Sequence, residues 1–175
     1  MDRRDAIVPA YKYFSGSSQN NGVSDNAPYI VGLDLRNPMN HGALIRLGAN
    51  IGARKVFFTS DPTHFSMTKI KKSAGSSHTS MDFVFTSFEK IVEEIPEDYA
   101  WIAIETSKKA TNLYETKLPE KCVFIAGNES YGLPDKVIGH CGYQVFIPMK
   151  GNTKSMNVSH ALAVTIFEWL RQRDY

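Results

Sequence analysis

The sequence from Cys122 to Leu133 reads CVFIAGNESYGL, and the sequence from Gln144 to Ser159 reads QVFIPMKGNTKSMNVS. In both stretches an apolar run passes directly into a loop of glycine and polar residues. The runs at Val123–Ala126 and Val145–Pro148 have the length and composition of strands that are covered on both faces. Ligands of open α/β sheets bind at the carboxyl ends of such strands, so the two loops predict a ligand site.

The two loops also carry the residue types that a ligand site needs. Glycines allow the backbone to approach a ligand closely, and polar side chains supply donors and acceptors where the strands end: Asn128, Glu129, Ser155 and Asn157. One such loop would be an ordinary strand-to-helix turn. The presence of two favours a site.

Strand and helix patterns alternate along the chain. Apolar runs predict further strands at Tyr29–Leu33, Lys55–Thr59, Phe83–Phe85 and Trp101–Ile104, and helical patterns follow most of them. This alternation predicts an α/β fold whose mostly parallel sheet has six strands and carries helices on both faces.

The expected helix boundaries follow from capping residues. Asn40 is a good N-cap for a helix that Gly52 would end, and Thr86 with Glu89 forms a capping box for another helix. The last helix, 157–172, is apolar on nearly every face, which predicts burial in the core or against a second subunit.

Composition narrows the class of protein. The 175 residues fit one domain, and a net charge of +2 means that any contact with nucleic acid needs a local basic patch. The two cysteines have no metal-binding spacing, and we see neither a membrane-spanning run nor a secretory signal. We therefore expect a cytoplasmic protein with a flexible extension at residues 1–28 and a folded domain at residues 29–175.

The sequence leaves two interpretations open for Arg46 and two for a cluster of three lysines. Arg46 is either a solvated surface charge or a functional residue. Lys69, Lys71 and Lys72 either complement the dipole at a helix C-terminus or face RNA. A redox enzyme with a dinucleotide fold is disfavoured, because Gly32 stands alone and neither the glycine fingerprint nor a P-loop is present.

Three segments together resemble the motifs of the SpoU (TrmH) branch of the SPOUT RNA methyltransferases, in the order and spacing of that family. They are NPMNHGALIR at 37–46, IAGNESYGL at 125–133 and IPMKGNTKSMNVS at 147–159. The resemblance implies an S-adenosylmethionine-dependent RNA 2′-O-ribose methyltransferase with a C-terminal trefoil knot (the SPOUT fold), which acts as a homodimer. Met39 and His41 depart from the usual first motif, and we interpret His41 as a polar filler at the helix start.

The resemblance also implies roles for individual residues. S-adenosylmethionine would be bound by Ile104, Thr106, Gly127, Ile147, Ser155 and Met156, and no metal is implied. The catalytic residue would be Arg46, supported by Asn40, Glu129, Ser155 and Asn157, with Glu129 holding the guanidinium of Arg46 in place.

The choice of RNA is open at this point. The small, catalytic-domain-only build favours tRNA as the substrate. Ribosomal RNA with the same chemistry is one alternative, and a non-catalytic, knotted RNA-binding protein is another. The presence of all five catalytic residues argues against the latter, because an inactive protein would be free to lose them. The sequence does not reveal the modified nucleotide or the proton acceptor for its 2′-hydroxyl.

Overall fold

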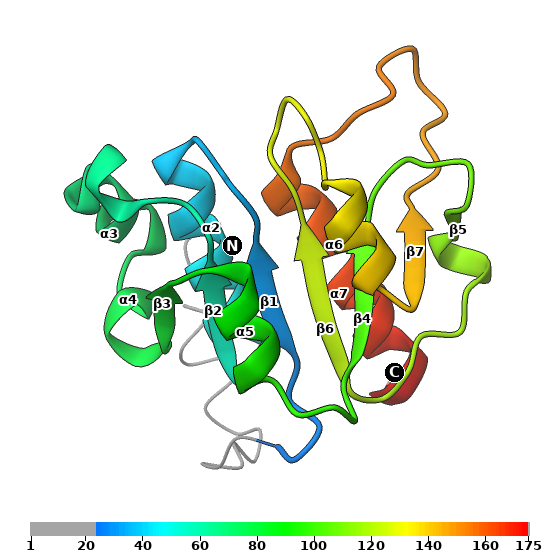
Figure 1. Cartoon of the computed structure of the whole chain (residues 1–175), viewed down its shortest axis with the longest axis horizontal. Coiled ribbons are helices and arrows are strands. Elements are labelled where there is room, and N and C mark those ends of the chain that lie inside the picture. Colours follow the sequence, from blue (N-terminus) through cyan, green and yellow to red (C-terminus); the bar gives the residue numbers. More distant parts are fainter. Residues whose placement is uncertain (1–23, 175) are drawn as a thin grey trace, which may run out of the picture.

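The protein is built around one parallel sheet, which Figure 1 shows in a computed structural model that describes residues 24–174. The sheet has seven strands in the order β3-β2-β1-β6-β4-β7-β5. The strands are β1 (Tyr29–Gly32), β2 (Lys55–Phe58), β3 (Phe83–Phe85), β4 (Ala100–Ile104), β5 (Thr111–Asn112), β6 (Cys122–Ala126) and β7 (Tyr143–Phe146). The α/β class and the parallel sheet are therefore confirmed.

The predicted number of six strands is wrong by one. The additional strand is β5, a two-residue edge strand that pairs in parallel with Val145 and Phe146 of β7. It lies in a polar segment and has no apolar run, so its sequence carries no strand pattern.

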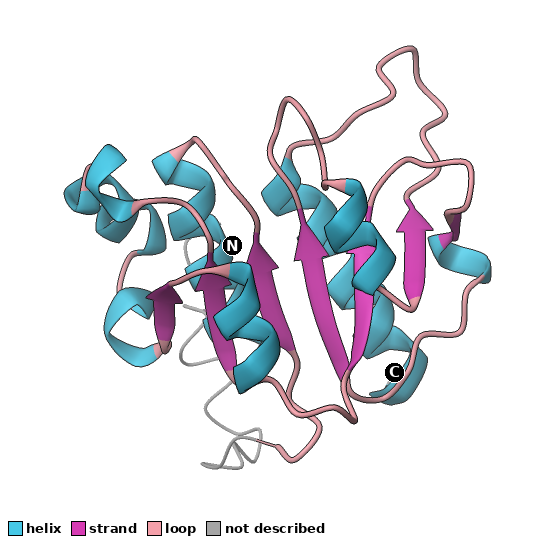
Figure 2. Cartoon of the chain, viewed as in Figure 1, coloured by secondary structure: helices cyan, strands magenta, loops and turns pink. Residues whose placement is uncertain are grey.

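Helices cover both faces of the sheet (Figure 2). They are α2 (Pro38–Ile51), η3 (Pro62–His64), α3 (Met67–Ala74), α4 (Ser77–Ser80), α5 (Phe88–Glu94), η4 (Leu113–Glu115), α6 (Asp135–His140) and α7 (Val158–Asp174). One buried cluster joins α2 and α7 to the sheet, and a second cluster on the opposite face includes Ile91 of α5 and Val137 of α6. None of the helices in the described part of the chain is long and apolar enough to cross a membrane.

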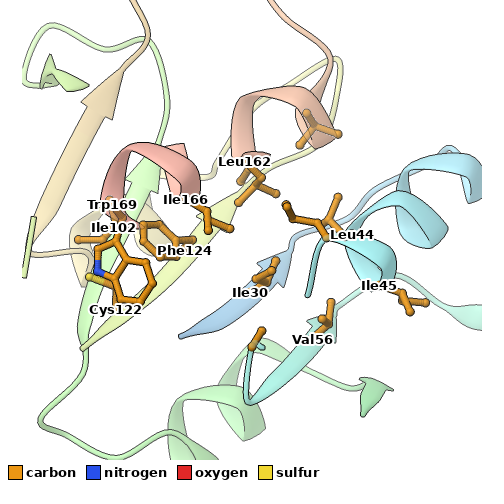
Figure 3. Close-up of a cluster of buried hydrophobic side chains, with 14 of the residues drawn as sticks. Ile30, Leu44, Ile45, Val56, Ile102, Cys122, Phe124, Leu162, Ile166 and Trp169 are labelled. Atoms are coloured by element: carbon orange, nitrogen blue, oxygen red, sulfur yellow. The ribbon is translucent and has the colours of Figure 1, made fainter. Parts of the chain in front are cut away.

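The sheet separates the two buried clusters, one on each of its faces. Ile30 faces α2 and α7, whereas Val31 belongs to the cluster on the other face, as expected from the alternation of side chains along a strand. Figure 3 shows Leu162 and Ile166 of α7 packed over Ile30 and Phe124. Cys122 is fully buried here, and burial raises the pKa of its thiol to about 12.

Several element boundaries differ from the predictions. Asn37, not Asn40, caps α2, because Pro38 occupies the first helical position and Asn40 therefore falls within the first turn. Ser87 rather than Thr86 caps α5. The end of α2 at Gly52, with φ 65°, is as predicted.

Helix α7 is buried on one side only within the described part of this chain. Its buried apolar residues Val158, Leu162, Ile166 and Trp169 lie on the core face, whereas Phe167 is 55% exposed. The apolar residues between these two sides are partly buried, so α7 leaves part of its apolar surface open to solvent.

The predicted extension at residues 1–28 lies mostly outside the described residues. Its last part, residues 24–28, is attached to the domain. The hydroxyl of Tyr99 donates to the carbonyls of Asp25 and Ala27, and Arg54 donates to the carbonyls of Ser24 and Asp25.

Candidate functional site

A cavity of about 800 Å³ lies at the carboxyl ends of β4, β6 and β7. Its walls come from three loops that are far apart in the sequence: 104–107, 126–133 and 145–158. All six residues predicted to bind a cofactor line this cavity: Ile104, Thr106, Gly127, Ile147, Ser155 and Met156. The volume lies within the usual range for small-molecule sites, roughly 300–1,000 Å³.

Glu105 connects two of these loops. One carboxylate oxygen accepts a hydrogen bond from the backbone N–H of Leu133 at 2.9 Å, and the other accepts from Thr106 N–H at 2.9 Å. Gly132 makes the contact possible, because its φ of 67° suits glycine and a Cβ there would overlap the Glu105 carboxylate. Glu105 was not among the predicted site residues, although its position just after β4 is a signal for such a role.

Gly127 is required by a close approach within the second loop. A Cβ on Gly127 would overlap the backbone of Gly132, so no larger residue fits without opening the turn. Asn128 holds the same turn from within. Its side-chain oxygen accepts from the N–H groups of Ser130 and Tyr131, and its amide donates to the carbonyl of Asp34 at 2.8 Å.

A polar chain connects residues from all three sequence motifs. The side-chain amide of Asn40 donates to Glu129 at 2.7 Å, and the amide of Asn157 donates to the side-chain oxygen of Asn40 at 3.1 Å. Asn157 also accepts from the N–H of Ser159 and so caps α7. The structure thus brings together three of the five predicted catalytic residues.

Glu129 is held ionised at the centre of this chain. Partial burial alone would raise the pKa of its carboxyl group. Hydrogen bonds from its own N–H, from the Asn40 amide and from the N–H groups of Arg36 and Asn37 outweigh this effect, so the pKa lies below its usual value. Glu129 therefore fixes the loop between β1 and α2 onto the loop after β6.

Arg46 does not contact Glu129, which corrects the expectation that this carboxylate holds its guanidinium. Arg46 follows Asn40 by six residues, so it points about 120° away around the helix. It is exposed, and its guanidinium lies beside Gly75 at the end of α3. It has no hydrogen bond or ion pair with any residue in the described range. Ser155 is also exposed and lies at the cavity wall.

His41 is a core residue rather than part of the site. It is fully buried against the rings of Phe58, Phe65 and Phe85, and its two ring nitrogens contact the Asn37 carbonyl and the Ser60 hydroxyl. Burial lowers its pKa. The interpretation of His41 as a non-catalytic residue agrees with this position.

The fold and the cavity define an α/β protein with a ligand site assembled from strand-end loops. Within residues 24–174, no group of three or more metal-binding side chains is present. The model of the SpoU rRNA Methylase family matches residues 27–167. The chain belongs to this family.

Individual relatives agree with this assignment. A 23S rRNA (guanosine-2′-O-)-methyltransferase, RlmB, of Pseudomonas syringae pv. tomato is 30% identical over 153 residues. The alignment covers 86% of this chain and 61% of that protein, so the chain spans about three fifths of the relative's length.

Two solved structures share the fold. One, described as giving insights into 2-OH methylation of C/U34 on tRNA, has a TM-score of 0.74 at 26% identity and covers 85% of this chain and 97% of its own. The other is the TrmH/SpoU tRNA modifying enzyme of A. aeolicus, with a TM-score of 0.74 at 21% identity, covering 87% of this chain and 78% of its own.

Proposed function

We propose that this protein is an S-adenosylmethionine-dependent RNA 2′-O-ribose methyltransferase whose catalytic domain is residues 29–175. The observation that carries the proposal is the cavity at the strand ends. It collects the six residues assigned to the cofactor, and the polar chain from Glu129 through Asn40 to Asn157 adjoins it. Relatives named as RNA 2′-O-methyltransferases support the same activity.

The residues of the cavity fit the proposed cofactor. Ile104, Leu133 and Ile147 offer an apolar slot for an adenine ring, and backbone groups of the glycine-containing turn are available at its edge. When bound, S-adenosylmethionine would supply an activated methyl group on a sulfonium centre. The protein then has to position the ribose and assist the loss of one proton.

Arg46 is proposed as the catalytic residue, acting through charge. An arginine with a pKa of roughly 12.5 or more is a poor base near neutral pH. Its exposed guanidinium, which pairs with none of residues 24–174, is instead suited to bind a phosphate next to the target nucleotide and to stabilise the developing alkoxide. Asn40, Glu129, Ser155 and Asn157 would fix the surrounding loops and the ribose.

We favour tRNA as the substrate. The support is the structure concerned with C/U34 of tRNA, which this fold covers almost completely, at 97% of that chain. Ribosomal RNA is the second candidate, because the curated relatives carry 23S rRNA names.

Two further features belong to the proposal. We expect a trefoil knot where the loops at 126–133 and 147–157 surround the cavity, and a cytoplasmic homodimer. Support for the dimer comes from α7, which leaves Phe167 exposed beside other partly buried apolar residues.

Transfer of a tritiated methyl group tests the activity. The full chain is incubated with labelled cofactor and either bulk tRNA or ribosomal RNA isolated from cells that lack the gene, and the digested nucleosides are then separated. We expect label in a 2′-O-methylnucleoside from tRNA. Label in ribosomal RNA alone would move the substrate assignment, and label in neither RNA would contradict the proposed function.

A further inference from the structure

Charge is distributed unevenly along this nearly neutral chain. Residues 35–81 contain seven lysine and arginine residues but only one acidic residue, Asp61, whereas the remaining positions carry 13 basic and 17 acidic residues. The basic segment comprises α2, β2, α3 and α4. The net charge of +2 therefore conceals one strongly basic segment of the sequence.

The exposed cations of this segment concentrate on α3. Lys69, Lys71 and Lys72 are exposed, and none of them has an ion pair with any of the residues that the structure describes. Lys55, in contrast, pairs with Glu94 at 2.8 Å and with Asp82 at 3.5 Å. The α3 lysines thus keep their charge available to a partner.

Helix capping does not account for all three lysines. Lys71 and Lys72 lie in the last turn of α3, where cations interact favourably with the helix dipole. Lys69 lies in the first turn, where a cation is unfavourable and where α3 has no acidic residue. The helix dipole therefore does not explain the position of Lys69.

Helix α3 is attached closely to the helix that carries Asn40 and Arg46. A Cβ on Gly42 of α2 would overlap the backbone of Ile70 and the side chain of Ser73, so the two helices pack at the closest distance that glycine allows. The hydroxyl of Ser73 donates to the carbonyl of Met39 at 2.9 Å. Figure 1 shows α3 beside the start of α2, at the edge of the sheet where the strands end.

We propose that the lysines of α3 form a surface that binds the phosphodiester backbone of the RNA substrate away from the reacting nucleotide, whereas Arg46 acts at that nucleotide. The inference rests on the proposed function and deepens it. Close packing against α2 would fix the bound backbone relative to Arg46. Because contacts with phosphates carry no sequence information, this surface would position RNA without selecting its sequence.

Salt dependence of RNA binding tests this surface. Fluorescence anisotropy with labelled bulk tRNA would give Kd from about 50 to 200 mM salt for the wild type and for the variant with Lys69→Gln, Lys71→Gln and Lys72→Gln. Each phosphate contact contributes roughly 0.7–0.9 to the slope of log Kd against log salt, so we expect the slope to fall by about 2 to 3. A matched control changes to glutamine three exposed lysines outside α3 that also have no ion pair with any residue described here: Lys90, Lys109 and Lys117.

The outcomes separate this inference from the proposed function. The control should keep the wild-type slope to within about 0.5, less than one phosphate contact, and both variants should bind S-adenosylmethionine like the wild type. If the α3 variant keeps the wild-type slope, or if the control loses as much, the inference is wrong and the proposed activity is unaffected. If the wild type binds neither tRNA nor ribosomal RNA, both are overturned.

Discussion

Replacing Gly132 by alanine tests how the loops of the cavity are held together. Gly132 has a φ of 67°, and a Cβ there would displace the Glu105 carboxylate from its hydrogen bond to Leu133. Gly52 provides a matched control. Its φ is 65°, and a Cβ there would meet no atom within 4 Å.

The two substitutions differ by one interaction. Placing alanine in the left-handed region costs about 1–2 kcal/mol, and both variants incur this cost. Only Gly132→Ala also loses the charge-assisted hydrogen bond between Glu105 and Leu133, which contributes about 1.5–3 kcal/mol. We therefore expect Gly52→Ala to lower the free energy of unfolding by about 1–2 kcal/mol and Gly132→Ala to lower it by about 2.5–5 kcal/mol.

Urea unfolding measures both changes, and calorimetry with S-adenosylmethionine measures their effect on the cavity. Gly132→Ala should weaken cofactor binding about tenfold or more, because 1.4 kcal/mol corresponds to a factor of ten. Gly52→Ala should bind like the wild type, since it lies at the far end of α2. Equal losses of stability in the two variants, with unchanged cofactor affinity, would refute the role assigned to Glu105.

Three other predictions concern the catalytic role of Arg46, the burial of His41 and the dimer contact at Phe167. Arg46→Lys keeps the charge but loses the planar fork, so single-turnover methylation should fall about 100-fold or more while cofactor binding is unchanged; a rate within about threefold of wild type would place the catalytic centre elsewhere. Burial lowers the pKa of His41 below 6.5, so below pH 6.5 the unfolded chain binds more protons than the folded chain does. The free energy of unfolding should therefore decrease there as the pH falls, by up to about 1.4 kcal/mol per pH unit. His41→Phe should remove this part of the decline in urea titrations between about pH 6.5 and 5, and an unchanged pH profile would show that His41 contributes nothing to it. Light scattering should give twice the chain mass of 19.6 kDa for the wild type and a smaller mass for Phe167→Glu; a monomeric wild type at micromolar concentration would exclude the dimer.

Much of the fold could be predicted because its strands are buried on both faces. Continuous apolar runs mark β1, β2, β4 and β6 within one or two residues. The run at Val145–Pro148 was displaced by two residues, because β7 begins at the exposed Tyr143 and ends before Pro148. Strand β5 was missed because an edge strand of two polar residues is formed by pairing with its neighbour rather than by its own sequence.

The residues that line the cavity could be predicted from the sequence, but the contacts between the predicted catalytic residues could not. Strand-end loops supplied the cavity residues, since parallel strands deliver their carboxyl ends to one edge. The hydrogen bond between Asn40 and Glu129 depends on where α2 begins, and one shift of the N-cap to Asn37 turned Asn40 inward. The same helix geometry turned Arg46 outward, toward Gly75. The directions in which the Asn40 and Arg46 side chains point follow from the tertiary arrangement and not from the sequence motif.

Titration calorimetry of the wild-type chain with S-adenosylmethionine tests the central claim, that the cavity at the strand ends is a cofactor site. We expect saturable binding of S-adenosylmethionine or its demethylated product without RNA and no binding of NAD. Binding should be lost in Gly127→Ala, whose Cβ would overlap the backbone of Gly132 across the turn. Absence of heat with both S-adenosylmethionine and its product at about millimolar concentration, where even binding of only about −4 kcal/mol is detectable, would contradict the account.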